Sequence, residues 1–422
     1  MSVHISDIHA REILDSRGDP TLEVVVQTSV GAVGRASVPS GASTGSHEAR
    51  ELRDTHAARF AGLGVVGAVG HVRAEIREAL VGRAFRDQVE LDEALIALDG
   101  TSDKSRLGAN AIVGVSMAAA RAFAVQDGEP LWRSLPGAAE RALLPMPHFN
   151  VVGGGAHVAG ALGLPQFMFA PLGARSEREA VRTGVEVSQA LRARLAAAGP
   201  STAGLGHEGG FALSTDGVEQ VLDTLVAAIE DAGYAAGREG VAVALAPAAD
   251  GFYLDGLYHV GGQAFSSAEM VDWYDELTTR YPVWSIEDGL AEDDRSGWIA
   301  LTERLGSRVQ IVGGDIFATD PVTIEKAIGE GIANAALIKI NQIGTVTETL
   351  RAIEVCRRHG YAQMVSHRSG ETVDDFIADL AVGAGCGQIK AGAPARGECV
   401  AKYNRLMEIE DCTLMRFGLR AA

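Results

Sequence analysis

The feature that most constrains this chain is a regular alternation of short apolar runs and amphipathic segments in its second half. The apolar runs are candidate strands, and the later ones recur at intervals of roughly 25 residues, with helical periodicity between them. These candidate strands are Pro147–Val152, Phe167–Pro171, Val241–Leu245, Val283–Ile286, Val309–Val312, Ala335–Ile340, Ala362–Val365 and Gly387–Lys390. The alternation predicts an α/β fold in which parallel strands form a barrel, helices lie outside, and chemistry takes place at the carboxyl ends of the strands.

The first part of the chain has a different pattern. Two strand-like runs joined by a short turn are followed by two helical patterns, which predicts a small α+β domain. These four segments are Thr21–Thr28, Ala32–Val38, about Ala57–Leu80 and Asn110–Val125. We therefore predict an N-terminal α+β domain over residues 1–134 and a βα barrel domain over residues 135–422. The Gly- and Ser-rich stretch Pro39–Asp54 between strands and helices is either a plain surface loop or a lid over a ligand.

Composition and net charge limit the kinds of molecule that this chain is expected to bind. With 422 residues, 47% of them apolar and 22% charged, the chain resembles an ordinary soluble globular protein. Its formal net charge of −18 argues against nucleic acid or an anionic membrane as a partner, because the field repels phosphates. The opening MSVHISDIHA lacks the features of a signal peptide, and no uninterrupted apolar run is long enough to span a bilayer. We predict a cytoplasmic protein whose small anionic substrate requires a local basic pocket.

A single lysine, Lys339, interrupts the apolar run Asn334–Gly344 (NAALIKINQIG). A short apolar run of this kind is typical of a buried parallel strand, so Lys339 is expected at or near its carboxyl end, partly desolvated. Desolvation disfavours the ammonium form and lowers the pKa towards the range in which a lysine acts as a base. The alternative is a lysine whose stem packs while its head reaches water.

Polar residues that follow the apolar runs are the candidates for chemistry. They are Glu287, Asp288, Asp315, Lys339, His367, Arg368, Ser369 and Lys390. Three cations from three strands that meet at one mouth indicate an anion with several oxygens, such as a phosphorylated carboxylate. Two GxGxxG patterns, Gly62–Gly67 and Gly204–Gly209, do not follow a strand and open a helix, which argues against a dinucleotide.

Six long motifs connect the chain to a known family. They are Asp15–Thr21 (DSRGDPT), Pro39–Ala49 (PSGASTGSHEA), Ser285–Leu290 (SIEDGL), Ile338–Thr345 (IKINQIGT), Val365–Thr372 (VSHRSGET) and Gly387–Arg396 (GQIKAGAPAR). In these motifs the chain resembles the enolase family nearly from end to end. The resemblance implies an N-terminal α+β cap domain on a modified βα barrel, a homo-oligomer (dimer or octamer), and reversible dehydration of 2-phosphoglycerate to phosphoenolpyruvate with two Mg²⁺ ions.

The resemblance also implies roles for individual residues. Lys339 matches the base that removes the proton beside the carboxylate, and Glu208 matches the acid that assists departure of hydroxide. The other matches are His157 on a mobile loop, His367, Arg368 and Ser369 at the substrate and its phosphate, Lys390 at its carboxylate, and Ser43 on a lid that closes on the second metal.

Three positions depart from the family pattern. Gln166 stands where the family has a second active-site glutamate, and Ala246 and Gly314 stand where it has metal-ligand aspartates. Asp315 keeps the second aspartate of its pair, but of the three carboxylates for the first Mg²⁺ only Glu287 is left. Because one carboxylate is a poor anchor for Mg²⁺, we predict a weakened metal site, with Asp315 or Asp250 as candidate substitute ligands.

These losses also predict a pocket that is more positive and roomier, since Ala246 and Gly314 are small. We expect a diverged enolase-like enzyme that binds phosphoenolpyruvate, 2-phosphoglycerate or a phosphonate relative. Its chemistry would be altered towards phosphonate or phosphinate secondary metabolism, such as a transfer that forms a carboxyphosphonoenolpyruvate-like product. Two alternatives stay open, a working enolase with a rebuilt Mg²⁺ site and a non-catalytic enolase-like scaffold.

Overall fold

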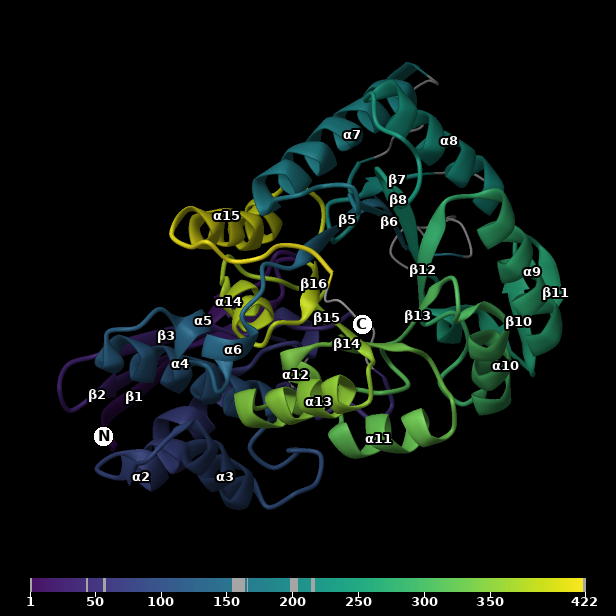
Figure 1. The fold of residues 1–422 in the computed structure, drawn as a ribbon. Coiled ribbons are helices and arrows are strands. Elements are labelled where there is room, and N and C mark those ends of the chain that lie inside the picture. The colour runs from purple at the N-terminus through teal and green to yellow at the C-terminus, as the bar shows by residue number, and fades with distance from the viewer. Residues whose placement is uncertain are drawn as a thin grey trace.

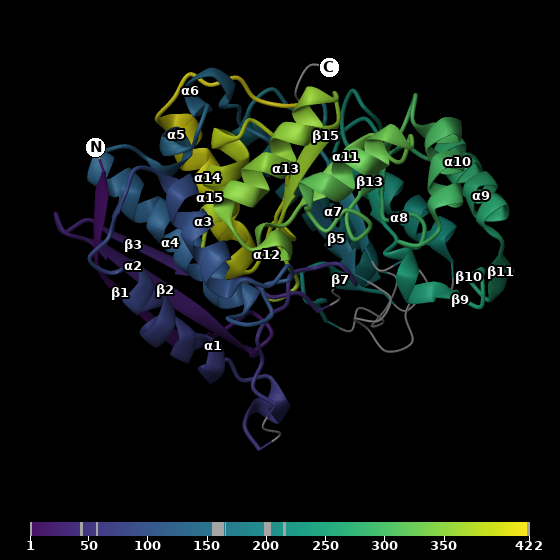
Figure 2. The same cartoon turned by 90° about the horizontal axis from the view of Figure 1, so that it is seen from below.

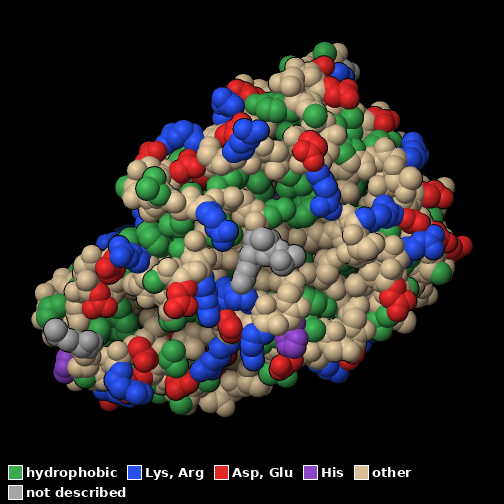
Figure 3. All heavy atoms as spheres, in the orientation of Figure 1, with side chains coloured by type: hydrophobic (Ala, Val, Ile, Leu, Met, Phe, Trp, Pro, Cys, Tyr) green, Lys and Arg blue, Asp and Glu red, His purple; other side chains and the backbone are tan. Residues whose placement is uncertain are grey.

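The chain folds into a barrel of strands and helices with a smaller sheet-and-helix part packed against one side (Figure 1). The structure is a computed structural model, and it describes residues 2–42, 45–55, 58–153, 164, 166–197, 204–213 and 217–419. Acidic and basic side chains interleave over the face seen in Figure 1, so the net charge of −18 does not form one acidic expanse there (Figure 3).

The smaller part contains a four-stranded antiparallel sheet in the order β3-β2-β1-β4. Its elements are β1 (Val3–Leu14), β2 (Pro20–Thr28), β3 (Val33–Ser37), α1 (Val66–His71), α2 (Arg77–Leu80), β4 (Ala84–Phe85), α3 (Gln88–Asp99), α4 (Ala109–Asp127), α5 (Leu131–Ser134) and α6 (Ala138–Arg141). The predicted hairpin corresponds to β2 and β3. The longest strand, β1, was not predicted because its charged residues break the alternation of apolar and polar positions.

Helix α4 connects the two parts. Among the described residues it is the one helix long and apolar enough to cross a membrane, yet 83% of its most apolar window is buried inside the protein. It packs on β2 and β3 and also reaches α12 (Ile340–Ile343) and α13 (Val346–Arg358), and Figure 2 shows the two parts side by side. Its apolar composition is therefore that of a core helix.

Eight of the described strands close the barrel, because β16 pairs with both β15 and β5. The strands are β5 (Met146–Gly153), β6 (Gln166–Ala170), β8 (Ala242–Ala246), β12 (Val283–Glu287), β13 (Gln310–Gly313), β14 (Ala335–Ile338), β15 (Ala362–Ser366) and β16 (Gly387–Lys390), with β7 (Phe211–Ala212) beside β5. From β12 onward their starting residues, 283, 310, 335, 362 and 387, keep the predicted spacing.

Helices form the outer layer of the barrel (Figure 1). They are α7 (Glu177–Ala197), α8 (Val218–Asp231), α9 (Ser267–Arg280), α10 (Arg295–Leu305), α11 (Pro321–Gly329), α13, α14 (Phe376–Gly383) and α15 (Gly397–Asp411), and a small sheet of β9 (Tyr253–Leu254), β10 (Leu257–Val260) and β11 (Gln263–Phe265) precedes α9. The side chains of Asp294, Asp320 and Thr345 cap the starts of α10, α11 and α13 by accepting a hydrogen bond from a backbone N–H. These caps fix where each helix begins after its strand.

The prediction that all barrel strands are parallel was wrong for β6. This strand runs antiparallel to both neighbours, β5 and β8, and antiparallel neighbours need no crossover helix between them. The first residue of β6, Gln166, therefore pairs with the last residues of β5 and β8, Gly153 and Ala246. The reversal places the start of one strand at the edge where the other strands end.

Candidate active site

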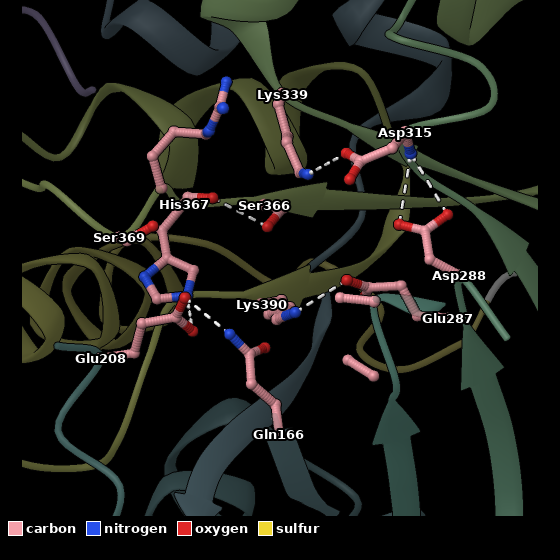
Figure 4. Close-up of a pocket in the computed structure, with 13 residues that line it drawn as sticks. Gln166, Glu208, Glu287, Asp288, Asp315, Lys339, Ser366, His367, Ser369 and Lys390 are labelled. Atoms are coloured by element: carbon pink, nitrogen blue, oxygen red, sulfur yellow. Dashed lines mark hydrogen bonds and ion pairs between the residues drawn. The ribbon is translucent and has the colours of Figure 1, made fainter. Parts of the chain in front are cut away.

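A cavity opens at the carboxyl ends of the barrel strands, with an empty volume of about 540 Å³. Its lining residues, apart from Glu208 in the loop before β7, come from seven of the eight barrel strands or the segments that follow them (Figure 4). They are Gln166, Glu208, Ala246, Ala248, Glu287, Asp288, Asp315, Lys339, Ser366, His367, Arg368, Ser369 and Lys390. Of the candidate site residues, the structure brings together all but the candidate substitute ligand Asp250, which does not line the cavity, and His157 and Ser43, which lie outside the described residues.

Lys339 lies immediately after β14 and points at Asp315, with 3.2 Å between Nζ and Oδ1 (Figure 4). Burial is the largest single influence on Lys339 and lowers its pKa, but the negative charges of Asp315, Glu48 and Asp288 together outweigh it, so the pKa lies above its ordinary value. The prediction of a lowered pKa was therefore wrong for the ligand-free protein. Burial also acts on Asp315, where the positive charges of Lys339 and Arg368 outweigh it and hold the pKa below its ordinary value.

Lys390, the last residue of β16, pairs with Glu287, the last residue of β12. Its Nζ donates to Oε1 of Glu287 at 2.9 Å, and both side chains are buried. The second carboxylate oxygen of Glu287, Oε2, has no hydrogen-bond partner among the described residues although it is buried. This oxygen is an acceptor that a bound ligand could satisfy.

Arg368 is held by the stretch that the sequence suggested as a lid. Its guanidinium donates to both carboxylate oxygens of Glu48, at 2.9 and 3.2 Å, and to Oδ1 of Asn341 at 2.9 Å. The backbone N–H of Ala42, in the same stretch, donates to Oγ of Ser369 at 3.2 Å. The described part of Pro39–Asp54 thus contacts two predicted phosphate ligands.

The backbone of Gly314 lies against Asp288. The N–H groups of Gly314 and Asp315 both donate to the Asp288 carboxyl, which is fully buried between them and Glu287. Burial, together with the charges of Asp315 and Glu287, raises the pKa of Asp288 well above its ordinary value. A Cβ atom at position 314 would lie 2.4 Å from Oδ2 of Asp288. The expectation that Gly314 frees volume was wrong, because Asp288 fills that space.

Glu208 occupies the opposite side of the cavity, in the loop before β7. Its Oε1 accepts a hydrogen bond from Nε2 of Gln166 at 2.8 Å, and its Oε2 lies 3.0 Å from Nε2 of His367 (Figure 4). The side-chain amide of Asn150, on β5, also donates to Oε2. The cavity thus has, opposite its ion-paired cations, a carboxylate that accepts from two side-chain amides and lies beside the imidazole of His367.

Comparison with known proteins agrees with this geometry. The model of the enolase N-terminal domain matches residues 5–135, and that of the enolase C-terminal TIM barrel domain matches residues 141–415. A protein named Enolase from Rubrobacter xylanophilus is 52% identical over 406 residues, which cover 96% of this chain and 94% of that protein. The chain belongs to the enolase family. It is an enolase-superfamily enzyme, of the lyase type, on an enolase α/β fold with a TIM barrel.

Enolases normally use Mg²⁺, so the residues of this cavity can be judged against that ion. Ala246 and Gly314 offer no side-chain oxygen, and one oxygen of Glu287 already accepts from Lys390. Asp250, a candidate substitute, is absent from the lining of the cavity and accepts from the backbone of Glu292 instead. Within the described ranges, no group of three or more His, Cys, Asp or Glu side chains is placed to hold a metal ion. These residues do not fit a three-carboxylate Mg²⁺ site.

Sequence reasoning missed two residues that hold the site together. Glu48 lies inside the motif PSGASTGSHEA, but nothing in the motif indicates that its carboxylate reaches Arg368. Asn150 lies in the apolar strand β5 and is buried. A polar amide in the middle of a buried strand is the signal that could have identified Asn150 as a residue with a required hydrogen-bond partner.

Proposed function

We propose that this enzyme binds phosphoenolpyruvate, 2-phosphoglycerate or a close phosphonate relative in the cavity, and that its chemistry differs from ordinary dehydration of 2-phosphoglycerate. One observation carries the proposal. The three cations Lys339, Arg368 and Lys390 line the cavity together, while two of the positions where the family has metal-ligand aspartates are Ala246 and Gly314. The groups that recognise a phosphorylated carboxylate are thus present without the full set of metal ligands.

Each candidate residue has a place in this proposal. Arg368, with Ser369 and His367, binds the phosphoryl or phosphonyl group, because a guanidinium contacts two oxygens at once. Lys390 binds the carboxylate. The proton transfers are assigned to Lys339 and Glu208. We also assign ligand contacts to His157 and Ser43, which lie outside the described residues, and to Gln166 beside Glu208.

The weakened metal site argues against ordinary turnover. Removing a proton from the carbon beside a carboxylate creates a dianionic enolate, which needs a strong and fixed positive charge to stabilise it. Glu287, with Asp315 as a candidate second ligand, is a poorer Mg²⁺ anchor than three carboxylates. We propose that Mg²⁺ binds weakly to the free enzyme and that tight binding requires oxygens from the substrate.

The finer proposal is a transfer reaction in phosphonate or phosphinate metabolism. The enol oxygen of phosphoenolpyruvate would exchange its phosphoryl phosphorus for the phosphorus of a carboxylated phosphonate such as phosphonoformate. A phosphonate oxygen attacks the phosphoryl phosphorus and the enol O–P bond breaks, and the enol oxygen then attacks the phosphonate phosphorus and displaces phosphate. Two P–O bonds break and two form, the inorganic phosphate carries away one oxygen of the phosphonate, and the product is carboxyphosphonoenolpyruvate-like.

Phosphorus NMR tests both levels of the proposal. With 2-phosphoglycerate and excess Mg²⁺ we expect negligible phosphoenolpyruvate, and with phosphoenolpyruvate and phosphonoformate we expect inorganic phosphate and a new phosphonyl signal. Dehydration at the ordinary enzyme rate of about 1 to 1000 per second would overturn the coarser proposal. Stable spectra in the second mixture would overturn the transfer.

Ligand-dependent stability tests binding without any turnover. Phosphoenolpyruvate at about a hundredfold excess over its dissociation constant should stabilise the fold by about 2.7 kcal/mol. Arg368→Lys should lose most of this shift, because a lysine cannot contact two phosphate oxygens in the same way. Arg351→Ala, which removes a half-exposed arginine outside the cavity, is the matched control and should keep the shift. An unchanged melting temperature with every phosphate and phosphonate tried would favour the scaffold.

A working enolase with a rebuilt Mg²⁺ site is the second candidate, and the 52% identity to a protein named Enolase supports it. Tight Mg²⁺ binding by the ligand-free protein would favour this candidate. We also propose that the N-terminal domain ends at residue 134 and the barrel domain begins at residue 135. We propose a cytoplasmic homo-oligomer, a dimer or an octamer, that has no nucleic-acid or membrane partner.

A further inference from the structure

The carboxylate of Glu208 accepts from two side-chain amides and lies beside an imidazole nitrogen, and these groups come from three strands or strand ends. Gln166 begins β6, Asn150 lies on β5, and His367 follows β15. Oε1 accepts from Gln166 at 2.8 Å, while Oε2 accepts from the amide of Asn150 and lies 3.0 Å from Nε2 of His367. Hydrogen bonds donated to a carboxylate stabilise its ionised form over its protonated form.

The side-chain amides of Asn150 and Gln166 can donate to Glu208 in one orientation only. Turning either amide around would place its carbonyl oxygen against a carboxylate oxygen, and two acceptors repel each other. In the observed orientation Oδ1 of Asn150 and Oε1 of Gln166 are buried and have no hydrogen-bond partner among the described residues. Both side chains therefore leave one acceptor unsatisfied while they donate to Glu208, which indicates how strongly this carboxylate orients its neighbours.

The residue at position 166 determines whether it can share a proton with the Glu208 carboxylate. Two glutamates at hydrogen-bond distance cannot both be ionised, so such a pair holds a shared proton near neutral pH. Gln166 replaces one member of that pair with a neutral amide that donates an N–H. The pair in this chain has no shared proton to give to a leaving hydroxide.

Other titratable groups face Glu208 from the elements packed around it. They are His207 beside it in the loop, His367 after β15, Arg396 before α15, and Cys399 and Tyr403 on α15. Burial raises the pKa of Cys399 to about 12 and that of Tyr403 well above its ordinary value, so both stay neutral. Arg396 donates to the backbone oxygen of Gly206 at 3.2 Å, and its Nε pairs with Oε1 of Glu398 at 2.6 Å.

We propose that Gln166 and Asn150 are positioning residues that keep Glu208 ionised, so that Glu208 accepts a proton from a hydroxyl or acid O–H of the bound ligand. The proton moves from the ligand oxygen to a carboxylate oxygen of Glu208, and the ligand oxygen keeps the electron pair. The family resemblance assigns Glu208 the opposite role of proton donor. The proposal rests on the proposed function only for the identity of that ligand.

Carbon-13 NMR of the full-length protein labelled at glutamate Cδ tests the ionisation state directly. The Glu208→Gln spectrum identifies the Glu208 signal, which we expect at the carboxylate position from about pH 5 to pH 9, well above the usual glutamate pKa. Gln166→Glu should create a coupled pair with one proton that is lost within this window. Gln263→Glu, at an exposed position on β11, is the matched control and should leave the Glu208 signal unchanged.

A protonated Glu208 in the wild type at pH 7 would overturn the proposal, as would a Gln166→Glu variant whose Glu208 signal matches that of the wild type. Neither measurement needs a ligand, so the proposal and the proposed function fail separately. If phosphoenolpyruvate binds while Glu208 is protonated, only the positioning role is lost. Failure of every phosphate or phosphonate to bind beside an ionised Glu208 would remove only the proposed function.

Discussion

Two sets of residues that line the cavity differ in how closely they match the enolase family pattern. The cation wall, which we define as Lys339, Arg368 and Lys390 at the ends of β14, β15 and β16, is complete. The carboxylate wall, which we define as positions 246, 287 and 314 at the ends of β8, β12 and β13, has one carboxylate left, Glu287. The two walls face one cavity and belong to one barrel.

Each cation of the cation wall forms an ion pair with a carboxylate that is not at position 246 or 314. Lys339 pairs with Asp315, Arg368 with Glu48, and Lys390 with Glu287. A buried charge without a partner is strongly destabilising, and the small residues at positions 246 and 314 leave none of these cations unpaired. The cation wall could therefore persist while the carboxylate wall changed.

The largest expected effect comes from breaking the cation wall. Arg368→Ala leaves the Glu48 carboxylate buried without its partner, and breaking such a pair costs about 3 to 5 kcal/mol. Urea unfolding of the wild type and the variant measures this loss of stability. Adding Glu48→Gln to Arg368→Ala removes the unpaired charge and should recover part of the loss. A loss below about 1 kcal/mol would mean that the pair behaves like one at the surface.

The next effect concerns space on the carboxylate wall. Gly314→Ala places a methyl group 2.4 Å from Oδ2 of Asp288, and such overpacking costs about 1 to 3 kcal/mol. Gly70→Ala in α1, where nothing lies within 4 Å of the added carbon, is the control and should be neutral or slightly stabilising. Thermal unfolding compares the two variants. Equal melting temperatures would show that Asp288 moves aside easily, so that Gly314→Asp could rebuild a ligand.

The next prediction concerns the Mg²⁺ affinity of the carboxylate wall. Ala246→Asp returns a carboxylate to the end of β8 without the clash expected at position 314, so it should raise Mg²⁺ affinity. We expect at least a tenfold increase, about 1.4 kcal/mol, by calorimetric titration into ligand-free protein. The matched change Ala197→Asp at the end of α7 adds the same charge far along the chain and should leave affinity unchanged. Tight binding by the wild type itself would contradict the weakened site.

The smallest effect is expected at Asp288. Burial and neighbouring carboxylates raise its pKa well above the ordinary value, so a neutral asparagine resembles its protonated form. Asp288→Asn should therefore change the free energy of unfolding at pH 7 by less than about 1 kcal/mol, because Oδ1 still accepts from the backbone of Gly314. Denaturant unfolding checks this. A larger loss would mean that Asp288 is ionised and takes part in the charge balance of the carboxylate wall.

The sequence by itself determined the family, the spacing of strands β12 to β16 and the residues that reach the cavity. Short apolar runs buried on both faces predict parallel strands, and a polar residue directly after such a run must lie at the carboxyl edge. Lys339, Arg368 and Lys390 follow this rule, and the structure places all three at the cavity. The departures at positions 166, 246 and 314 were inferred from the resemblance to the enolase family, and they lie outside the six motifs that carry it.

Only the tertiary structure decided how those residues interact. The reversal of β6, the contact of Glu48 with Arg368 and the filling of the Gly314 space by Asp288 depend on which segments meet in space. The proton affinity of Lys339 is the clearest case, since burial alone predicts a lowered pKa and the carboxylates of Asp315, Glu48 and Asp288 together reverse the sign. Local patterns fix burial and strand order, whereas the sign of an electrostatic effect depends on charges brought together from distant parts of the chain.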